Sequence, residues 1–279
     1  MLQEDENDCA DLRPRMPVRT WAKLGAATVL SIALSAGAAV QAAPGDEADA
    51  KEILKKMTDY IAAQNTINAT FDSDIEAVTT DLQKVQFASS GEVLLNRPDK
   101  LRANRQGGYS DVEMVFDGKT FSLFGKNLNS YAQIDAPGTI DELADRLKAG
   151  SGAALPAADL LLTRAYEELT AGVTDAKHIG LGVIGGVECE HLAFRTPEVD
   201  WQLWVRTGDT PIPCKYVITS KTLAGSPEYT LVVTDWRTDT PAEANAFEFR
   251  PPDGATKVAA ENLDQLDEIP AGVAAGVRR

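Results

Sequence analysis

The chain has 279 residues, of which 44% are hydrophobic, and carries a formal net charge of −15 at pH 7. This length and composition suit a folded protein with one large domain. The negative charge disfavours nucleic acid and anionic lipid headgroups as surface partners, because like charges repel, whereas an apolar cargo held inside the protein is compatible with it.

The first 42 residues are typical of a secretory signal peptide. Four basic residues between Arg13 and Lys23 precede an apolar run at residues 24–40, and Ala42 ends a stretch of small residues. The run is at the lower limit of about 17 residues for a transmembrane helix and is rich in small side chains. We therefore expect cleavage after Ala42, a periplasmic location and no stable membrane span afterwards. The acidic start leaves Met16 as an alternative first residue.

Residues 47–64 are predicted to form a helix. Apolar residues recur on one face at helical spacing, namely Ala50, Ile53, Leu54, Met57, Tyr60 and Ile61. A single amphipathic helix must bury this face against another layer, so we expect a sheet to follow.

Alternation of apolar and polar residues then predicts a series of strands. They cover residues 68–79, 82–95, 100–106, 112–116 and 120–124. Gly91 predicts a bulge or bend inside the second strand, and Pro98 ends it. Asp117-Gly118 predicts a tight hairpin turn. Short turns between successive strands indicate an antiparallel sheet.

Two helices are predicted to interrupt the strands. The first covers residues 139–149 and begins with a capping box formed by Thr139 and Glu142. The second begins at Pro156 and runs to Thr170. Two interpretations remain open: the helices simply cover the sheet, or they form a movable lid.

Strands are predicted to resume at Thr174 and to continue to Trp236. They include residues 187–195, 201–206, 215–221 and 229–236, with a turn at residues 185–186. Pairing Phe194 with Trp201 and Leu192 with Leu203 aligns apolar side chains on one face. The acidic, Ala- and Gly-rich tail at residues 259–279 is expected to be disordered.

Two cysteines, Cys189 and Cys214, remain once cleavage removes Cys9. The periplasm permits a disulfide between them. The predicted register instead places them on opposite faces of the sheet, where a bridge would require a bulge. The sequence favours free thiols without deciding the matter.

No motif indicates catalysis, so we expect no enzyme activity and no cofactor. The sequence lacks Gly-x-Ser-x-Gly, a phosphate-binding loop and Cys-x-x-Cys. Asp200, beside Trp201, is interpreted as a solvated residue at a strand start, and His191 as a surface strand residue. His178 and His191 are the two histidines and lack the spacing of metal ligands, so no metal site is expected.

Three segments, in this order, resemble the LolA/LolB-like lipoprotein-carrier superfamily of the periplasm. They are Asn96-Arg-Pro-Asp-Lys-Leu-Arg102, Phe116-Asp-Gly-Lys-Thr-Phe121 and Phe247-Glu-Phe-Arg-Pro-Pro-Asp-Gly254. Residues 189–220 are not typical of the carriers themselves, and the chain looks more similar to a related family of predicted periplasmic proteins. The ligand therefore stays open.

The resemblance, together with the predicted elements, implies an α+β fold over residues 43–258. We expect a single large, strongly curved antiparallel sheet, a half-barrel of ten or eleven strands. The N-terminal helix and the two inserted helices would cover its concave face.

The resemblance also implies a site. In the carriers, the arginine of the Arg-Pro motif bonds to the lid helices and holds the empty cavity shut, and Arg97 stands at this position. A surface arginine at a strand end is the alternative. The expected cavity lining is Phe71, Ile75, Phe87, Val93, Leu95, Phe121, Leu123, Leu143, Leu147, Leu161, Trp201, Leu203, Tyr216 and Ile218. An ordinary hydrophobic core would explain the same residues.

Two functions follow from this reading. The first is a soluble periplasmic protein that shelters a lipid, an acyl chain or a lipoprotein anchor in the apolar half-barrel. The alternative is an interaction or sensor module that binds another envelope protein through the same fold without transporting lipid.

Overall fold

The computed structural model describes residues 44–151, 157–243 and 245–261. The expected signal peptide and residues 262–279 of the expected tail lie outside this part of the chain. Within it, no helix is both long and apolar enough to span a bilayer.

Four helical segments and twelve strands make up the described chain. The helical segments are α1 (Pro44–Ala62), α2 (Ile140–Ser151), the 3₁₀ helix η1 (Ala158–Leu161) and α3 (Ala165–Thr170). The strands are β1 (Thr66–Val78), β2 (Lys84–Asn96), β3 (Lys100–Gly107), β4 (Asp111–Phe116), β5 (Thr120–Gly125), β6 (Ser130–Asp135), β7 (Asp175–Ile184), β8 (Val187–Arg195), β9 (Val199–Arg206), β10 (Pro213–Ser220), β11 (Glu228–Thr238) and β12 (Thr256–Lys257).

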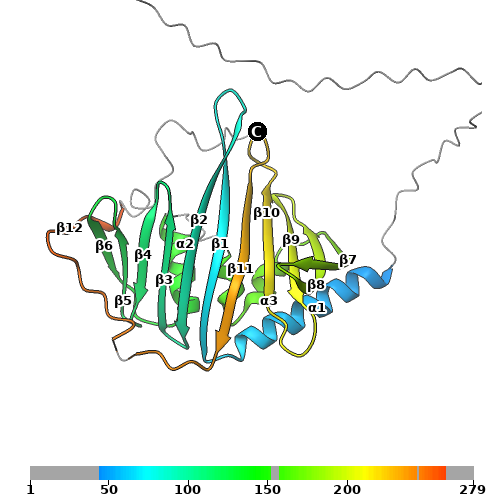
Figure 1. Ribbon diagram of the computed structural model, residues 1–279, viewed down its shortest axis with the longest axis horizontal. Coiled ribbons are helices and arrows are strands. Elements are labelled where there is room, and N and C mark those ends of the chain that lie inside the picture. The colour runs from blue at the N-terminus through cyan, green and yellow to red at the C-terminus, as the bar shows by residue number, and fades with distance from the viewer. Residues whose placement is uncertain (1–43, 152–156, 244, 262–279) are drawn as a thin grey trace, which may run out of the picture. The chain divides into compact units, whose positions relative to one another are not determined.

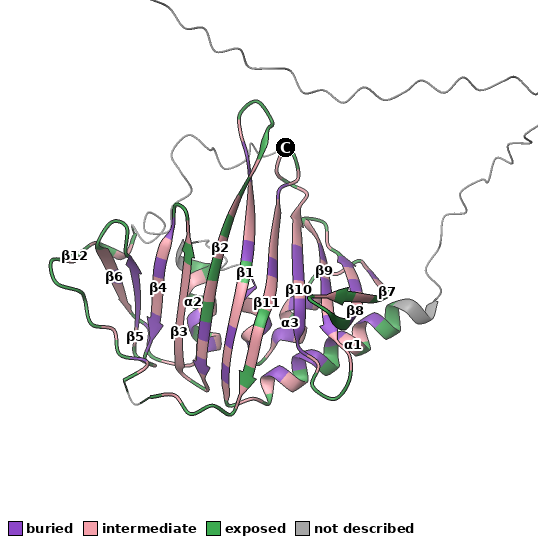
Figure 2. Cartoon of the chain, in the orientation of Figure 1, coloured by how far each residue is buried: buried purple, intermediate pink, exposed green. Residues whose placement is uncertain are grey.

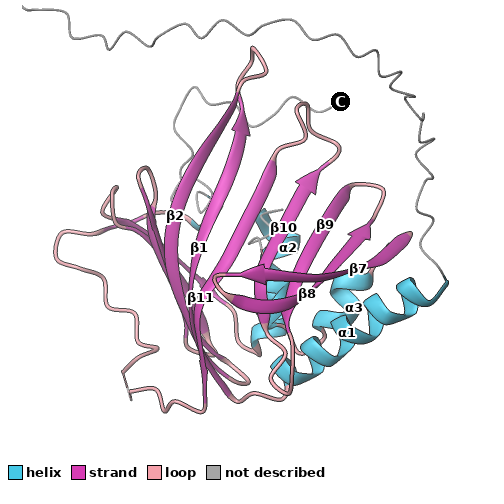
Figure 3. Ribbon diagram, turned by 45° about the vertical axis from the view of Figure 1, so that its right-hand side comes forward, coloured by secondary structure: helices cyan, strands magenta, loops and turns pink. Residues whose placement is uncertain are grey.

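All twelve strands belong to one sheet in the order β12-β6-β5-β4-β3-β2-β1-β11-β10-β9-β8-β7 (Figure 1). Eleven strands pair in antiparallel fashion, and the two-residue β12 pairs in parallel with β6. Figure 3 shows β7 and β8 turned across the direction of β1 and β11, so the sheet is strongly curved and open. The expected fold class is confirmed, with β6 and β12 as strands that the sequence reading missed.

Local sequence signals account for several element boundaries. Asp117 accepts backbone hydrogen bonds from Lys119 and Thr120 through its Oδ1 atom, and Gly118 has a φ of 86°, which builds the β4–β5 turn. At the start of α2, the Thr139 N–H donates to Glu142 and the Glu142 N–H donates to the Thr139 hydroxyl, as the capping box predicts.

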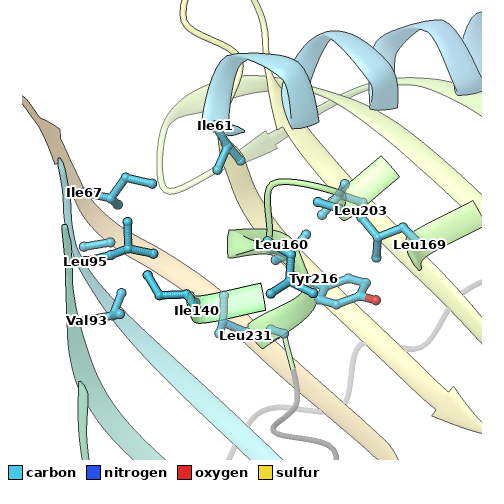
Figure 4. Packing of buried hydrophobic residues seen from close by; sticks show 14 of the residues in the cluster. Ile61, Ile67, Val93, Leu95, Ile140, Leu160, Leu169, Leu203, Tyr216 and Leu231 are labelled. Atoms are coloured by element: carbon cyan, nitrogen blue, oxygen red, sulfur yellow. The ribbon is translucent and has the colours of Figure 1, made fainter. Parts of the chain in front are cut away.

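The core lies between one face of the sheet and the helices. Figure 4 shows sheet side chains such as Leu95 and Leu231 pointing toward Ile140 and Leu160 of the helical segments. The predicted β8–β9 register is confirmed, because Leu192 pairs with Leu203 and Phe194 with Trp201 on this buried side. Packing of the apolar faces thus holds helices and sheet together.

The second inserted helix was predicted as one piece from Pro156 to Thr170, and this is wrong. η1 ends at Leu161, Leu162 has extended backbone angles, and α3 begins at Ala165. Between them, Asp141 of α2 accepts hydrogen bonds from the backbone N–H and the hydroxyl of Thr163. This tertiary contact satisfies a backbone donor that a continuous helix would use internally.

Gly91 does not produce the expected bulge. It pairs in regular register with Phe71, and a Cβ atom added at Gly91 would lie 2.5 Å from Cζ of the Phe71 ring and closer still to the Asn104 carbonyl oxygen. The glycine therefore makes room for an aromatic ring lying across β2. The nearby irregularity occurs between Thr70 and Phe71, where β1 pairs with β11.

Cys189 and Cys214 form a disulfide, contrary to the expectation from register. Pro213 pairs with Val205 and Lys215 with Trp204, so Cys214 is the extra residue of a bulge in β10. The bulge changes the direction of the side chain. The predicted register allowed a disulfide only if one of the strands contained a bulge, and β10 contains one.

Candidate functional site

An apolar cavity of about 140 Å³ lies between the sheet and η1. Among the described residues, fifteen line it: Ala69, Phe71, Val93, Leu101, Ala103, Met114, Ala157, Ala158, Leu160, Leu161, Pro213, Tyr229, Leu231, Val233 and Trp236. None of them carries a charge. The cavity is therefore suited to a hydrocarbon group.

The cavity wall comes from two sources. β11 supplies Tyr229, Leu231 and Val233, whose alternate spacing places their side chains on one face of the strand. η1 and the residue before it supply the opposite wall, including Leu160 and Leu161. Ligand pockets usually measure roughly 300–1,000 Å³, so a cavity of about 140 Å³ would have to widen to hold a long chain.

Arg97 connects η1 to the end of α1. Its Nη2 atom donates to the Leu161 carbonyl at 2.8 Å and to the Ile61 carbonyl at 3.4 Å, and its Nε atom donates to the Gln64 carbonyl at 3.0 Å. Burial lowers the pKa of the guanidinium, and the charge of Asp141 opposes this shift. One side chain thus satisfies carbonyl groups at the ends of two helical segments.

A second hollow, which we call the arginine hollow, lies over β1, β2 and β3 and measures about 350 Å³. Its lining residues are Ile75, Gln86, Phe87, Ala88, Ser89, Arg105, Gly107, Gly108, Tyr109 and Ser110. The rings of Phe87 and Tyr109 meet edge to face with centroids 5.5 Å apart.

A third hollow, which we call the acidic hollow, lies beside η1 and α3. Asp159, Glu168 and Glu198 are among its lining residues. Burial raises the pKa of Asp159 to about 6, and a hydrogen bond from the Leu160 N–H partly offsets this effect. The Tyr216 hydroxyl, also on this hollow, has a pKa raised well above its usual value by burial.

The structure distributes the expected lining residues over several environments. Phe71, Val93 and Leu161 line the cavity. Ile75 and Phe87 line the arginine hollow, and Trp201, Tyr216 and Ile218 line the acidic hollow. The others, which are Leu95, Phe121, Leu123, Leu143, Leu147 and Leu203, pack in the hydrophobic core.

The sequence reading missed most of the cavity wall. β3 contributes Leu101 and Ala103, and β11 contributes four residues from Tyr229 to Trp236. The alternation of Tyr229, Leu231 and Val233 marked these three as one apolar face. Their position opposite η1 was not visible, because it depends on β11 lying at the centre of the sheet beside β1.

The two residues considered for catalysis are engaged elsewhere. Asp200 is bound by Arg195 and Lys221, and these hydrogen bonds lower its pKa to about 2. His191 stacks on Trp204 with centroids 4.0 Å apart and pairs with the Gln202 side chain at 2.9 Å. Among the described residues, no group of three or more His, Cys, Asp or Glu side chains could hold a metal ion.

An open, curved antiparallel sheet with an apolar cavity beneath inserted helices defines the class of this protein as an α+β half-barrel. Residues 50–260 match the family described as "Predicted periplasmic protein (DUF2092)". The match covers more than half of the chain, which belongs to this family. The expected similarity to a family of predicted periplasmic proteins is thereby confirmed. No relative was found among the curated proteins.

Several solved structures are similar to the chain at low identity. An uncharacterized conserved protein from Thermus thermophilus is 13% identical with a TM-score of 0.45, covering 76% of this chain and 99% of that one. LprF from Mycobacterium bovis is 11% identical with a TM-score of 0.45, covering 73% and 99%. The MucA/MucB complex of Pseudomonas aeruginosa contains a chain that is 14% identical with a TM-score of 0.41, covering 72% and 61%.

Proposed function

We propose that the protein is a soluble periplasmic binding protein that shelters the hydrocarbon chain of a lipid or of a lipoprotein anchor. The observation that carries this proposal is the uncharged cavity, whose walls come from the sheet on one side and from η1 on the other. Burying a chain there removes apolar surface from water, which contributes roughly 25 cal/mol per Å².

Entry of such a chain requires η1 to move away from the sheet. Of the cavity wall, Leu160 and Leu161 belong to this single short turn, and Arg97 holds the turn through the Leu161 carbonyl. We propose that Arg97 acts as the latch of a lid, defined as residues 139–151 and 157–170. Ligand binding and latch formation would then be competing states of the same segment.

The family description supports a periplasmic location, and we propose that a signal peptide cleaved after Ala42 delivers the chain there. We propose a binding rather than an enzymatic role. Asp200 and His191 already have strong partners, and Tyr229 is the one titratable residue among the described residues of the cavity wall.

The test is binding of a fluorophore with a long acyl chain, combined with lipid extraction from protein purified from its native periplasm. Ala103→Phe would fill the cavity and should strongly weaken binding. Ala193→Phe enlarges a half-buried residue on the other face of the sheet and is the matched control. Protein that carries no lipid and binds no fluorophore would overturn the proposal.

A second candidate function is binding of another envelope protein through the edge of the sheet. β7 ends the strand order, and Ile179, Leu181 and Val183 on it are 55%, 62% and 68% exposed (Figure 2). Exposed apolar edge strands are places where another chain can add a strand. Chemical cross-linking in envelope extract tests it. A stoichiometric partner lost in Leu181→Lys, together with an empty cavity, would favour this function over lipid binding.

A further inference from the structure

The acidic hollow lies next to the cavity, on the face of the sheet that the helices cover. Tyr216 of β10 lines the hollow and pairs with Leu231 of β11, which lines the cavity. On the helical side, Asp159 lines the hollow and the next residue, Leu160, lines the cavity. The hollow measures about 420 Å³, and the β8–β9 turn and the end of α3 complete its wall. It therefore offers a polar site beside the apolar one.

The Tyr216 hydroxyl is a polar group without a partner in this hollow. Tyr216 is 3% exposed, and its hydroxyl makes no hydrogen bond within the part of the chain that the structure describes. Its oxygen is not completely enclosed, and Figure 4 shows it pointing away from Leu160 and Leu231. Leaving a buried hydroxyl without a hydrogen bond is costly. A molecule in the hollow that donates to this oxygen would remove that cost.

Asp159 brings an unpaired carboxylate to the same space. It accepts the Leu160 N–H at 3.1 Å and has no ion pair with a described residue. Lys148 acts on it only through its charge, because the Lys148 ammonium bonds to Glu168 at 2.7 Å. The charge of Asp159 contributes to the raised pKa of Tyr216, so the carboxylate and the hydroxyl lie close enough to influence each other.

The other two acids of the hollow differ from each other. Glu168 is paired, since it binds Lys148 at 2.7 Å and Arg164 at 3.0 Å. Glu198, in the β8–β9 turn, is exposed, and its carboxylate has no ion pair with a described residue. No basic residue is among the described residues that line the hollow. Two unpaired carboxylates, those of Asp159 and Glu198, thus lack a cation to balance them.

The kind of cation follows from the geometry of these groups. A primary ammonium group has three N–H donors, which match the carboxylates of Asp159 and Glu198 and the oxygen of Tyr216. A quaternary ammonium group has no N–H donor and would depend on an open aromatic face. The Trp201 ring of the hollow is already covered, because Phe194 stacks on it at 4.0 Å and Tyr216 meets it edge to face.

We propose that the acidic hollow binds the primary ammonium group of an organic ligand. The Asp159 carboxylate pairs with the ammonium, the Tyr216 oxygen accepts one of its hydrogen bonds, and Glu198 adds a second negative charge. Two sources share this chemistry: a small free amine, and the headgroup of an amino lipid whose chain enters the neighbouring cavity. The site goes beyond the proposed function and does not depend on it.

The test measures binding of octylamine, octyltrimethylammonium and octanol by calorimetry. At pH 8 the Asp159 carboxyl is ionised and an alkylammonium keeps its proton. Wild type should bind octylamine most tightly. Tyr216→Phe should weaken octylamine binding by roughly tenfold, the effect of losing one charge-assisted hydrogen bond. Binding of the trimethylated probe should stay within about twofold in this variant, because it has no N–H to donate.

A second variant removes the charge and keeps the shape of the side chain. Asp159→Asn should weaken binding of both cations by roughly tenfold and leave octanol unchanged. The matched controls are Tyr131→Phe in β6 and Asp49→Asn in α1, neither of which is among the described residues that line the hollow. Both control variants should bind octylamine as wild type does.

Ethylamine, which is too short to extend into the cavity, distinguishes the two sources. Ethylamine binding within about tenfold of octylamine binding would support a free amine as the ligand. Octylamine binding more than about a hundredfold tighter would support an amphiphile, because burial of the longer chain adds to the affinity. Either result supports the ammonium site, provided that Tyr216→Phe weakens binding.

Three results would overturn the site. They are absence of binding by both amines, equal binding of octylamine and octanol, and octylamine binding that neither Tyr216→Phe nor Asp159→Asn changes. These results leave the cavity proposal standing, because an acyl-chain fluorophore tests that proposal separately. Conversely, ethylamine binding by a protein that binds no acyl-chain fluorophore would overturn the proposed function and support the ammonium site.

Discussion

At the residue level, the first prediction concerns the hydrogen bonds of Arg97. Its guanidinium donates to Leu161 of η1, to Ile61 in the last turn of α1 and to Gln64 just beyond that helix. Arg97→Leu leaves these carbonyls without their charged donor, a loss of roughly 1.5–3 kcal/mol. Hydrogen exchange should rise in η1 and the last turn of α1 more than in the strands. The variant should also retain an acyl ligand longer, because the closed empty form no longer competes as well.

Arg146→Leu is the matched control for Arg97. Arg146 also donates to backbone carbonyls, those of Asp135 and Pro137. It belongs to α2, and within the part of the chain that the structure describes it makes no hydrogen bond to η1. Equal exchange in both variants, or exchange in η1 unchanged by Arg97→Leu, would contradict the latch.

Gly91 gives a second prediction at this scale. Gly91→Ala places a Cβ atom against both the Phe71 ring and the Asn104 carbonyl oxygen, and such overpacking costs roughly 1–3 kcal/mol of stability. Gly108→Ala is the control, since an added Cβ there meets nothing within 4 Å. Urea unfolding of both variants measures the difference. Equal stability of the two variants would show that the Phe71 ring and the backbone at Asn104 move aside at little cost.

At the level of elements, the 3₁₀ helix η1 is predicted to respond to pH through Asp159. The pKa of this carboxyl is about 6 in the folded protein against an ordinary value of 3.8. The folded state therefore binds more protons than the unfolded state between these values, and the contribution of Asp159 to stability rises as the pH falls. From pH 7 to pH 5, wild type should gain about 1 kcal/mol relative to Asp159→Asn.

Urea unfolding at the two pH values, with Asp49→Asn on the exposed side of α1 as the control, measures this gain. A wild-type protein that follows the pH dependence of Asp159→Asn would show that Asp159 stays ionised down to pH 5.

For the whole molecule, the disulfide between Cys189 and Cys214 should contribute substantially to stability. It joins residues 25 apart in sequence, and closing a loop of this length stabilises the folded state by about 3 kcal/mol in the chain-entropy description. The double variant Cys189→Ser with Cys214→Ser should lose about this amount in urea unfolding. Peptide mapping without reductant checks the bond directly, and two free thiols in periplasmic protein would contradict it.

Much of the fold could be predicted because its signals are local or pairwise. The face of α1 with Leu54, Met57 and Ile61 is set by helical spacing, and these residues are fully buried. The pairing of Phe194 with Trp201 follows from aligning apolar residues on two neighbouring strands. Each of these features depends on residues within one element or one hairpin.

The candidate site was less predictable, since an apolar residue carries the same sequence signal in a core and in a cavity. Leu95 and Leu203 were expected in the lining and are fully buried in the core. Leu231 and Trp236 line the cavity because β11 lies next to β1, a pairing of strands far apart in sequence. No local sequence pattern distinguishes an apolar residue of the core from one that lines the cavity.

By itself, the sequence determined the family, the antiparallel class of the sheet and the apolar faces of most elements, since side-chain periodicity and turn residues act over a few positions. Tertiary structure alone decided where the helix predicted from Pro156 to Thr170 divides, how the two cysteines come together and which apolar faces line the cavity. Asp141 reaches Thr163 from another helix, and the β10 bulge turns Cys214 toward Cys189. These features arise from contacts between distant segments, whose geometry exists only once the sheet has curved and the helices have packed against it.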